Sequence, residues 1–293
     1  MLRWLIGVAV GLAALYGALA LVWGPGPLIA VFPWYVPMMH SFAALAALSV
    51  SFLSAGRYQV LREPSALWIG GAFGAFAILS LFYVLSWPGL VSEERGLIAQ
   101  LPDTAAWLWT LRFSALATLL LAAVLLPWPE AGTPWERWWL WLGVAGLVAV
   151  TLIGSLLVVF ERFLPLLVVD GAWTPLQVAW LYALLVAFAA GSVLSAHRYR
   201  QTGNSLLGYV AMVQLLLAFG ILTAVIGGKH YDLWWYGQRL LMVGGFSVLL
   251  FGLLSEYVGL YRRERYYARV AEERAAQLAA TIESMADAVI LAD

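Results

Sequence analysis

Long uninterrupted runs of apolar residues, separated by short polar segments, dominate the pattern along this chain. Eight of them reach the length of about 20 residues that a helix needs to cross a bilayer. They are Leu2–Trp23, Trp34–Ala55, Ser65–Trp87, Thr104–Leu126, Trp138–Phe160, Pro175–Ala196, Leu206–Gly227 and Tyr236–Leu260. Backbone groups in lipid must be hydrogen-bonded within their own segment, so such runs predict helices. We therefore predict an all-α fold, a polytopic bundle of eight transmembrane helices.

The pattern changes after Leu260, where Arg, Glu and Ala become frequent. Apolar or small residues then recur at alternating steps of three and four, at Ala268, Ala271, Ala275, Leu278, Ile282, Met285 and Val289. This spacing is typical of a heptad seam in a coiled coil. It predicts a cytoplasmic helix that continues the last crossing and pairs with a second copy in a homodimer. The alternative is a single helix whose apolar face lies on the membrane.

Composition supports a membrane protein and excludes several other classes. The chain is 63% hydrophobic and 11% charged, whereas a soluble domain has about 25% charged residues. Its net charge is zero, and no basic stripe lies outside the segment next to the membrane, so we expect no nucleic-acid partner. Cysteine is absent, which excludes disulfides and cysteine-bound metals.

Basic residues in the connections predict the orientation, because Lys and Arg concentrate on the cytoplasmic side. One side of the predicted bundle holds Arg95, Arg162 and Lys229. The other side holds Arg3, Arg57, Arg62, Arg137, Arg198, Arg200, Arg262, Arg263, Arg265, Arg269 and Arg274. We therefore predict that both termini are cytoplasmic and that the lipid bilayer is the principal partner of residues 1–260.

Polar side chains inside the predicted crossings are candidates for function, because they are costly in lipid. His40 and Arg112 fall in the outer half, and Gln214 falls near the middle of the seventh run. We predict an outward-facing pocket lined by His40, Tyr83, Trp87, Trp107, Arg112 and His230. Its ligand would be apolar with a polar head, such as a quinone, or a haem held by histidine. The alternative is that His40 and Arg112 only join helices through hydrogen bonds.

A second set of residues is predicted to transmit a signal along the last crossing and the helix after it. These residues are Arg239, Glu256, Tyr261, Ala271, Leu278 and Ile282. Gln177, Arg239 and Glu256 lie near the ends of their runs, where long polar side chains reach water or headgroups cheaply. We expect Arg239 to contact Asp232, a neighbouring helix or a headgroup, and Glu256 to pair with an arginine of the following helix.

Motifs of enzyme active sites are absent from the sequence. It has no phosphate-binding loop, no Gly-x-Ser-x-Gly turn and no histidines at metal-binding spacing. We predict neither catalytic residues nor a metal site in this chain.

Several short motifs resemble membrane-associated sensor (MASE) domains. The segment from Asp232 to Tyr236, followed by Arg239 and by Ser255–Glu256, resembles their closing helix. Leu85–Gly89 and Thr104–Leu108 resemble the fourth type of this family. The similarity covers roughly residues 30–265. It implies an input module of a bacterial histidine kinase or diguanylate cyclase, located in the inner membrane.

The final segment, Leu278–Asp293, resembles the beginning of a PAS domain, with a short helix followed by a first strand at residues 288–291. This resemblance divides the chain into a sensor domain at 1–260, a linker or coiled-coil helix at 261–282 and the start of a PAS domain at 283–293. It implies that the remaining output domain lies downstream.

Together these observations predict an integral-membrane input module. A stimulus would shift the last transmembrane helix, which would relay the change to a cytoplasmic PAS domain and a kinase or cyclase. Two alternatives remain open at this stage. One is a membrane redox protein that binds haem or quinone. The other is a transporter or channel with a cytoplasmic appendage.

Overall fold

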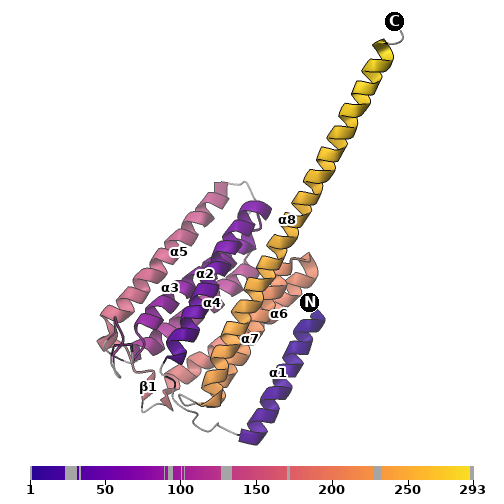
Figure 1. Cartoon of the computed structure of the whole chain (residues 1–293). Coiled ribbons are helices and arrows are strands. Elements are labelled where there is room, and N and C mark those ends of the chain that lie inside the picture. The colour runs from indigo at the N-terminus through magenta and orange to yellow at the C-terminus, as the bar shows by residue number, and fades with distance from the viewer. Residues whose placement is uncertain are drawn as a thin grey trace. The chain divides into compact units, whose positions relative to one another are not determined.

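The computed structural model describes residues 2–23, 32, 34–88, 90–91, 95–99, 101, 103–126, 134–169, 172–227 and 232–290. Within these residues the fold is all-α (Figure 1). The α-helices are α1 (Leu2–Trp23), α2 (Tyr35–Leu61), α3 (Pro64–Leu85), α4 (Asp103–Leu125), α5 (Pro134–Val159), α6 (Pro175–Thr202), α7 (Ser205–Gly227) and α8 (Leu233–Ile290). A 3₁₀ turn at Glu161–Phe163 and an antiparallel pair, β1 (Val168–Val169) and β2 (Ala172–Trp173), lie between α5 and α6.

Each apolar run overlaps a helix, which confirms the all-α part of the predicted fold class, whereas the predicted number of eight membrane crossings stays a prediction. Six helices, namely α2, α3, α4, α6, α7 and α8, are long and apolar enough to cross a membrane. Within α1 and α5 the described apolar stretches are shorter, at Ile6–Val22 and Ala145–Val159. Helix α6 continues past its apolar run to Thr202 and ends at Gly203, whose φ of 69° is left-handed. Glycine adopts this conformation without a steric penalty, so it terminates the helix there.

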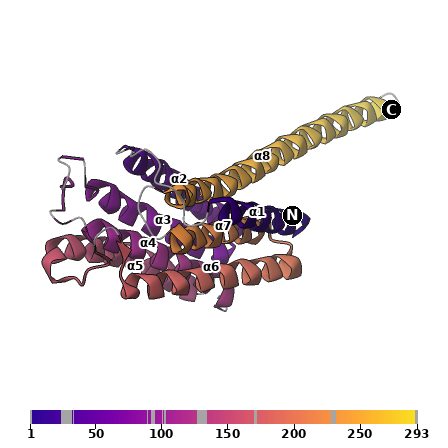
Figure 2. The same ribbon diagram turned by 90° about the horizontal axis from the view of Figure 1, so that it is seen from below.

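The chain divides into two compact units, Met1–Phe251 and Gly252–Asp293. In the first unit α3 packs against α2, α4 and α5, while α6 packs against α4 and α7. Helix α1 contacts α7. Figure 1 and the turned view in Figure 2 show α2, α3 and α4 next to one another. Helix α3 is thus the central element of this packing.

Aromatic rings form the middle of the first unit. Phe246 of α8 meets two rings of α3 edge to face, Phe73 at 5.1 Å and Phe76 at 4.8 Å between centroids. Phe76 also meets Phe113 of α4 at 5.4 Å. Edge-to-face pairs of this kind add to the free energy gained by burying the rings. They fix the first part of α8 against α3.

Small residues let two other helix pairs approach closely. A Cβ on Gly70 of α3 would lie 3.2 Å from the backbone oxygen of Ser51 in α2. A Cβ on Gly191 of α6 would lie 2.7 Å from the side chain of Gln214 in α7. Gln214 in turn accepts a hydrogen bond of 3.0 Å from Ser195. Close backbone approach at small residues is typical of helix packing in membranes.

A polar cluster joins the connection between α2 and α3 to the connection between α6 and α7. Arg57 donates to Glu63 at 3.0 Å and to Asn204 at 3.3 Å, and Asn204 donates to Glu63 at 3.0 Å. Arg57 is 8% exposed, so this ion pair is largely withdrawn from solvent. We call these three residues the Arg57 cluster. It fastens two helical hairpins together at one end of the bundle.

The second unit consists of the later part of α8. The assignment of α8 is helical at every residue from Leu233 to Ile290. Residues 288–290, expected to open a strand, belong to this helix, and residue 291 lies outside the described residues. A strand needs a partner strand for its backbone hydrogen bonds, whereas a helix satisfies them locally. No strand pairs with residues 288–290 within the described part of the chain, so local hydrogen bonding accounts for their helical conformation, although Val289 and Ile290 favour strands by their own propensity.

Candidate functional site

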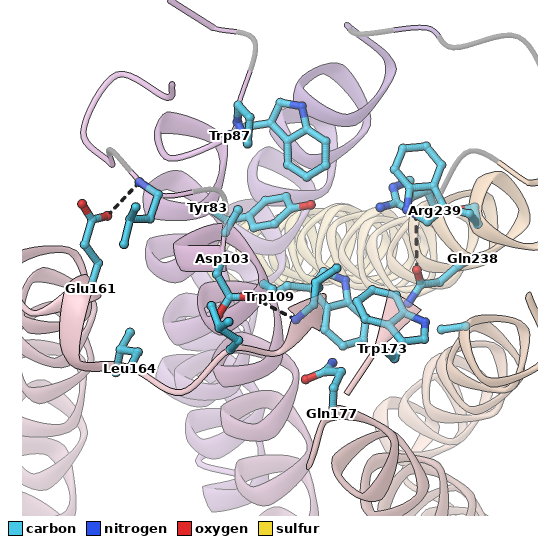
Figure 3. Close-up of a pocket in the computed structure, with 18 of the residues that line it drawn as sticks. Tyr83, Trp87, Asp103, Trp109, Glu161, Leu164, Trp173, Gln177, Gln238 and Arg239 are labelled. Carbon is cyan, nitrogen blue, oxygen red and sulfur yellow. Dashed lines mark hydrogen bonds between the residues drawn. The ribbon is translucent and has the colours of Figure 1, made fainter. Parts of the chain in front are cut away.

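A cavity of about 520 Å³, which we call the main cavity, lies within the first unit. Its walls come from the ends of several elements that are far apart in sequence. The lining residues are Tyr83, Trp87, Pro88, Leu101, Asp103, Ala105, Ala106, Trp109, Glu161, Arg162, Leu164, Leu166, Val168, Trp173, Gln177, Ala224, Trp235, Gln238 and Arg239 (Figure 3). Its volume lies within the range of about 300–1,000 Å³ found for small-molecule sites.

One wall belongs to the end of α3. Tyr83 is 2% exposed, and its ring lies 5.5 Å from that of Trp87. Two buried side chains, from the neighbouring helices α2 and α4, contact the Tyr83 ring. The ring of His40 in α2 meets it edge to face at 4.7 Å. The guanidinium of Arg112 in α4 lies 4.1 Å from its centroid. Tyr83 thus separates His40 and Arg112 from the main cavity.

Arg112 is enclosed almost entirely by aromatic rings. It is 0% exposed, and its guanidinium also lies 5.2 Å from the centroids of both Phe76 and Phe113. Its Nη1 donates a hydrogen bond of 3.3 Å to Ser80, while Nε and Nη2 make none within the described residues. The faces of the rings carry the negative end of their quadrupole and so stabilise this cation.

A second wall is the connection between α5 and α6, which is tied to the first turns of α4. The carboxylate of Asp103 accepts hydrogen bonds of 3.1 Å from the backbone N–H of Leu167 and of Val168. Glu161 accepts a hydrogen bond of 2.7 Å from Thr104. Trp107 donates at 2.9 Å to the carbonyl of Pro165. These bonds hold an otherwise irregular segment over the end of the bundle.

The third wall is the first two turns of α8. Asp232 precedes this helix, and its side chain accepts a hydrogen bond of 2.6 Å from the N–H of Trp235, as a helix cap does. Burial raises the pKa of the Asp232 carboxyl above its usual value, against hydrogen bonds from the Trp235 and Trp234 backbone and the charge of Arg239. This cap fixes the angular position at which α8 presents its side chains to the main cavity.

Arg239 stacks on its own helix rather than reaching a headgroup. Its guanidinium lies 3.5 Å from the ring centroid of Trp235, and it donates hydrogen bonds to the Trp235 carbonyl and, at 3.4 Å, to Gln238. Arg239 is 4% exposed and Gln177 is 1% exposed. Neither side chain is therefore exposed at the surface of the first unit, and the charge of Arg239 acts on the Asp232 carboxyl, in line with the contact expected between these two residues. The packing of α4, α6 and α8 around the main cavity encloses both of them.

The structure brings together four of the six residues expected in the ligand pocket. Tyr83 and Trp87 line the main cavity. His40 and Arg112 lie one layer behind, in contact with Tyr83. Trp107 is outside the lining and packs against Trp180 at 6.0 Å. His230 lies outside the described residues. Whether these residues bind a ligand stays a prediction.

Most of the lining residues were not predicted to belong to a pocket, among them Trp109, Trp173, Gln177 and Gln238. Gln177 accepts a hydrogen bond of 3.1 Å from Thr110, which joins α6 to α4. Gln238 is 6% exposed, and its Nε2 makes no hydrogen bond within the described residues. The available signal was the polarity of Gln177 and Gln238 at the ends of otherwise apolar runs.

The residues expected to transmit a signal all fall on α8. Arg239 lies in the wall of the main cavity. In the second unit Glu256 is half-buried, Tyr261 is 54% exposed and Leu278 is 62% exposed. Ala271 is also exposed, and the side chain of Ile282 lies outside the described part of the chain. Their role in transmission stays a prediction.

A search for metal-binding side chains found none. Within the described residues no group of three or more His, Cys, Asp or Glu side chains could hold a metal ion.

A comparison with protein families gives one match. The model of MASE3, a membrane-associated sensor domain, matches residues 37–258. The resemblance to membrane-associated sensor domains is thereby confirmed, with MASE3 as the matching model where the motifs had pointed to the fourth type. Comparisons with curated proteins and with solved structures gave no match.

Proposed function

Because the chain belongs to the MASE3 family of membrane-associated sensor domains, we propose that the main cavity receives the stimulus and that α8 relays it to a downstream output. One observation carries this proposal. Trp235, Gln238 and Arg239 of α8 form part of the cavity wall, and the same helix continues without a break to Ile290. An occupant of the main cavity therefore touches the element that leaves the membrane domain.

The energetics of such a relay are modest. A ligand shifts a two-state equilibrium only through its different affinity for the two states, and a few kcal/mol suffice. In the proposed mechanism, contact with Gln238 or Trp235 rotates or displaces the first turns of α8. The cap at Asp232 and the ring contacts of Phe246 set the resting position of the helix.

The membrane arrangement belongs to the same proposal. All eight helices cross the bacterial inner membrane, and both termini are cytoplasmic, with the main cavity at the outer end and the Arg57 cluster at the inner end. Eleven arginines lie in the connections on the proposed cytoplasmic side, at the N-terminus or after Leu260, and this excess supports the orientation. The heptad spacing between Ala268 and Leu278 supports a homodimer of the cytoplasmic helix.

The output is proposed to be a PAS domain followed by a histidine kinase or diguanylate cyclase. The resemblance of residues 278–293 to the start of a PAS domain supports it. In this arrangement the chain itself performs no catalysis, and a two-component or cyclase output reads the position of α8.

Inserting residues into α8 after Ala268, in the full-length protein, tests the relay. Each added residue turns the following helix by about 100°. Insertions of one, two or three residues should change the basal output by amounts that follow this rotation, while an insertion of seven restores the heptad phase and the output. Output activity in membranes is the measurement. Equal output from all of these insertions would contradict a mechanical relay through α8.

Transport receives less support from the geometry. Arg112 and Gln214, the polar residues predicted to lie deepest, occupy separate packed surroundings. Arg112 lies among the rings of Phe76, Tyr83 and Phe113, and Gln214 lies against Gly191 and Ser195. A transport route needs polar groups that line one continuous path.

A further inference from the structure

We infer that the main cavity binds a neutral molecule with a planar, conjugated ring that carries carbonyl acceptors, a class whose lipid-soluble members include the quinones. This inference rests on the proposed function, because it names the chemical class of the stimulus. Three properties of the lining support it.

Flat rings supply the first property. Five rings belong to the lining. Tyr83 lies in α3 and Trp87 follows the end of that helix, while Trp109, Trp173 and Trp235 lie in α4, β2 and α8. Figure 3 shows these walls around one space, with Tyr83 on one side and Arg239 on the other. Aromatic side chains favour stacked or edge-to-face contact with another ring. A guest with a planar ring therefore gains more contact energy from these walls than a flexible alkyl chain does.

The second property is a buried donor without an acceptor. Gln238 is 6% exposed, and its Nε2 makes no hydrogen bond within the described residues, although the side chain lines the main cavity. Leaving such an N–H group buried and unpaired costs about 1–3 kcal/mol. A carbonyl oxygen on the guest would satisfy it.

The acceptors of the lining are already engaged. Asp103 accepts from the backbone of Leu167 and Val168, and Glu161 accepts from Thr104. Gln177 likewise accepts from Thr110. These bonds leave the cavity better supplied with donors than with acceptors, which favours a guest that accepts hydrogen bonds.

Charge balance supplies the third property. The lining holds two acidic residues, Asp103 and Glu161, and two basic residues, Arg162 and Arg239. These four formal charges sum to zero, so neither a cation nor an anion gains a net attraction that would offset the cost of leaving water. The balance therefore favours a guest without net charge.

The residues that could bind iron distinguish this guest from haem. Histidine, cysteine and methionine, which supply most axial ligands of haem iron, are absent from the described lining. His40 is separated from the main cavity by Tyr83, with which it makes an edge-to-face contact. The lining thus supports stacking and carbonyl recognition rather than coordination of iron.

Binding of two matched probes to the purified chain in detergent tests the inference. Menadione has a planar skeleton of two fused six-membered rings with one methyl group and two carbonyls, and 2-methylnaphthalene has the same fused carbon skeleton and methyl group without carbonyls. Titration calorimetry, corrected for partition into empty micelles, should show menadione binding at least about tenfold more tightly, the factor expected for one well-placed hydrogen bond. A positively charged probe, 1-naphthylmethylammonium, should bind more weakly than menadione.

Variants locate the binding. Gln238→Leu should weaken menadione about tenfold and leave 2-methylnaphthalene unchanged, because only the carbonyl contact is lost. Gln201→Leu, at an exposed position near the end of α6, is the matched control and should change neither affinity. Ala106→Phe fills the main cavity and should abolish both, whereas Ala183→Phe, on the exposed face of α6, should not.

Equal affinity of the two probes, or an unchanged menadione preference in Gln238→Leu, would overturn the inference. If Gln238→Leu loses both probes through misfolding, the comparison of Ala106→Phe with Ala183→Phe decides whether binding occurs in the main cavity. These measurements are independent of any output. Probe binding without a response to insertions in α8 would contradict the proposed relay alone, and the reverse would contradict only the quinone class.

Discussion

At the scale of single residues, Arg112 is the most unusual feature of the molecule. It is a fully buried cation whose neighbours are a serine hydroxyl and three aromatic faces. Burying an arginine at membrane depth costs about 2.5–3.5 kcal/mol on insertion scales. Desolvated cation–π contacts return about 2 kcal/mol or more, and one interhelical hydrogen bond returns about 0.6 kcal/mol. These terms nearly cancel, so Arg112 contributes little net stability.

We therefore expect Arg112→Leu to keep the free energy of unfolding in detergent within about 1 kcal/mol of the original chain, because it removes a cost and a gain of similar size. Leu116→Ala is the control. This residue is 0% exposed in the same helix, and such a truncation costs about 2–5 kcal/mol. A loss as large in Arg112→Leu as in Leu116→Ala would show that Arg112 holds a partner essential for the fold.

Asp232 gives a pH dependence with a defined sign. Burial raises the pKa of its carboxyl, so the folded chain binds the proton more tightly than the unfolded chain. Its contribution to stability is therefore largest below the ordinary carboxyl pKa and falls as pH rises through the raised pKa. Asp232→Asn keeps an oxygen to cap α8 but carries no charge. The variant should be more stable than the original chain at neutral pH, and this advantage should shrink on acidification.

The measurement is the thermal unfolding midpoint of each chain in detergent, from about pH 4 to about pH 8. This range covers the pH at which a carboxyl with a raised pKa titrates. Other carboxyl groups affect both chains equally and cancel in the comparison. A difference that stays constant with pH would contradict the predicted sign.

The position of the site could be predicted only in part from single residues. Tyr83 and Trp87 are predicted to line the pocket because they fall in the same outer half of the predicted crossings as His40 and Arg112. Trp107 was chosen in place of Trp109, although the structure places only Trp109 in the lining. Two residues along a helix differ by about 200° in direction. When both faces of a helix are apolar, as in α4, the sequence does not indicate which face turns inward.

At the scale of elements, the helices themselves were predictable because lipid leaves the backbone no alternative. The predicted start of α6 at Pro175 and end of α7 at Gly227 agree with the structure. The connection between α5 and α6 was not predictable in the same way. Its position depends on Asp103 and Glu161, which bond residues about 60 positions away in sequence. Nothing in the local pattern indicates such pairings.

Packing of α2 against α3 gives a prediction at this scale, from two adjacent glycines. A Cβ on Gly70 would meet the Ser51 backbone at 3.2 Å, whereas a Cβ on Gly71 meets nothing within 4 Å. Gly71 faces an apolar groove of about 350 Å³ between α3, α4 and α5. Gly70→Leu should therefore destabilise the chain by about 1–3 kcal/mol through overpacking. Gly71→Leu should leave the free energy of unfolding unchanged, and the same unfolding assay compares the two variants directly.

At the scale of the whole molecule, the absence of cysteine allows a clean test of orientation. Phe163, which is 83% exposed, follows α5, and Arg198 lies near the end of α6. In intact cells a membrane-impermeant maleimide should label Phe163→Cys and not Arg198→Cys. Permeabilised cells should allow labelling of both. The opposite pattern would invert the proposed topology and place the main cavity on the cytoplasmic side.

The Arg57 cluster has a consequence for how the bundle deforms. The two hairpins are joined by the Arg57 cluster at one end of the bundle, and the main cavity lies at the other end. We therefore expect the two ends to differ in stiffness. A bilayer that thins or is stretched places a load on every helix, and we expect the elements to part more easily at the end that holds the main cavity than at the end joined by the Arg57 cluster. Mechanical tension and a small guest would then act along one and the same coordinate, so a membrane under strain should alter the apparent affinity of this receptor for whatever it detects.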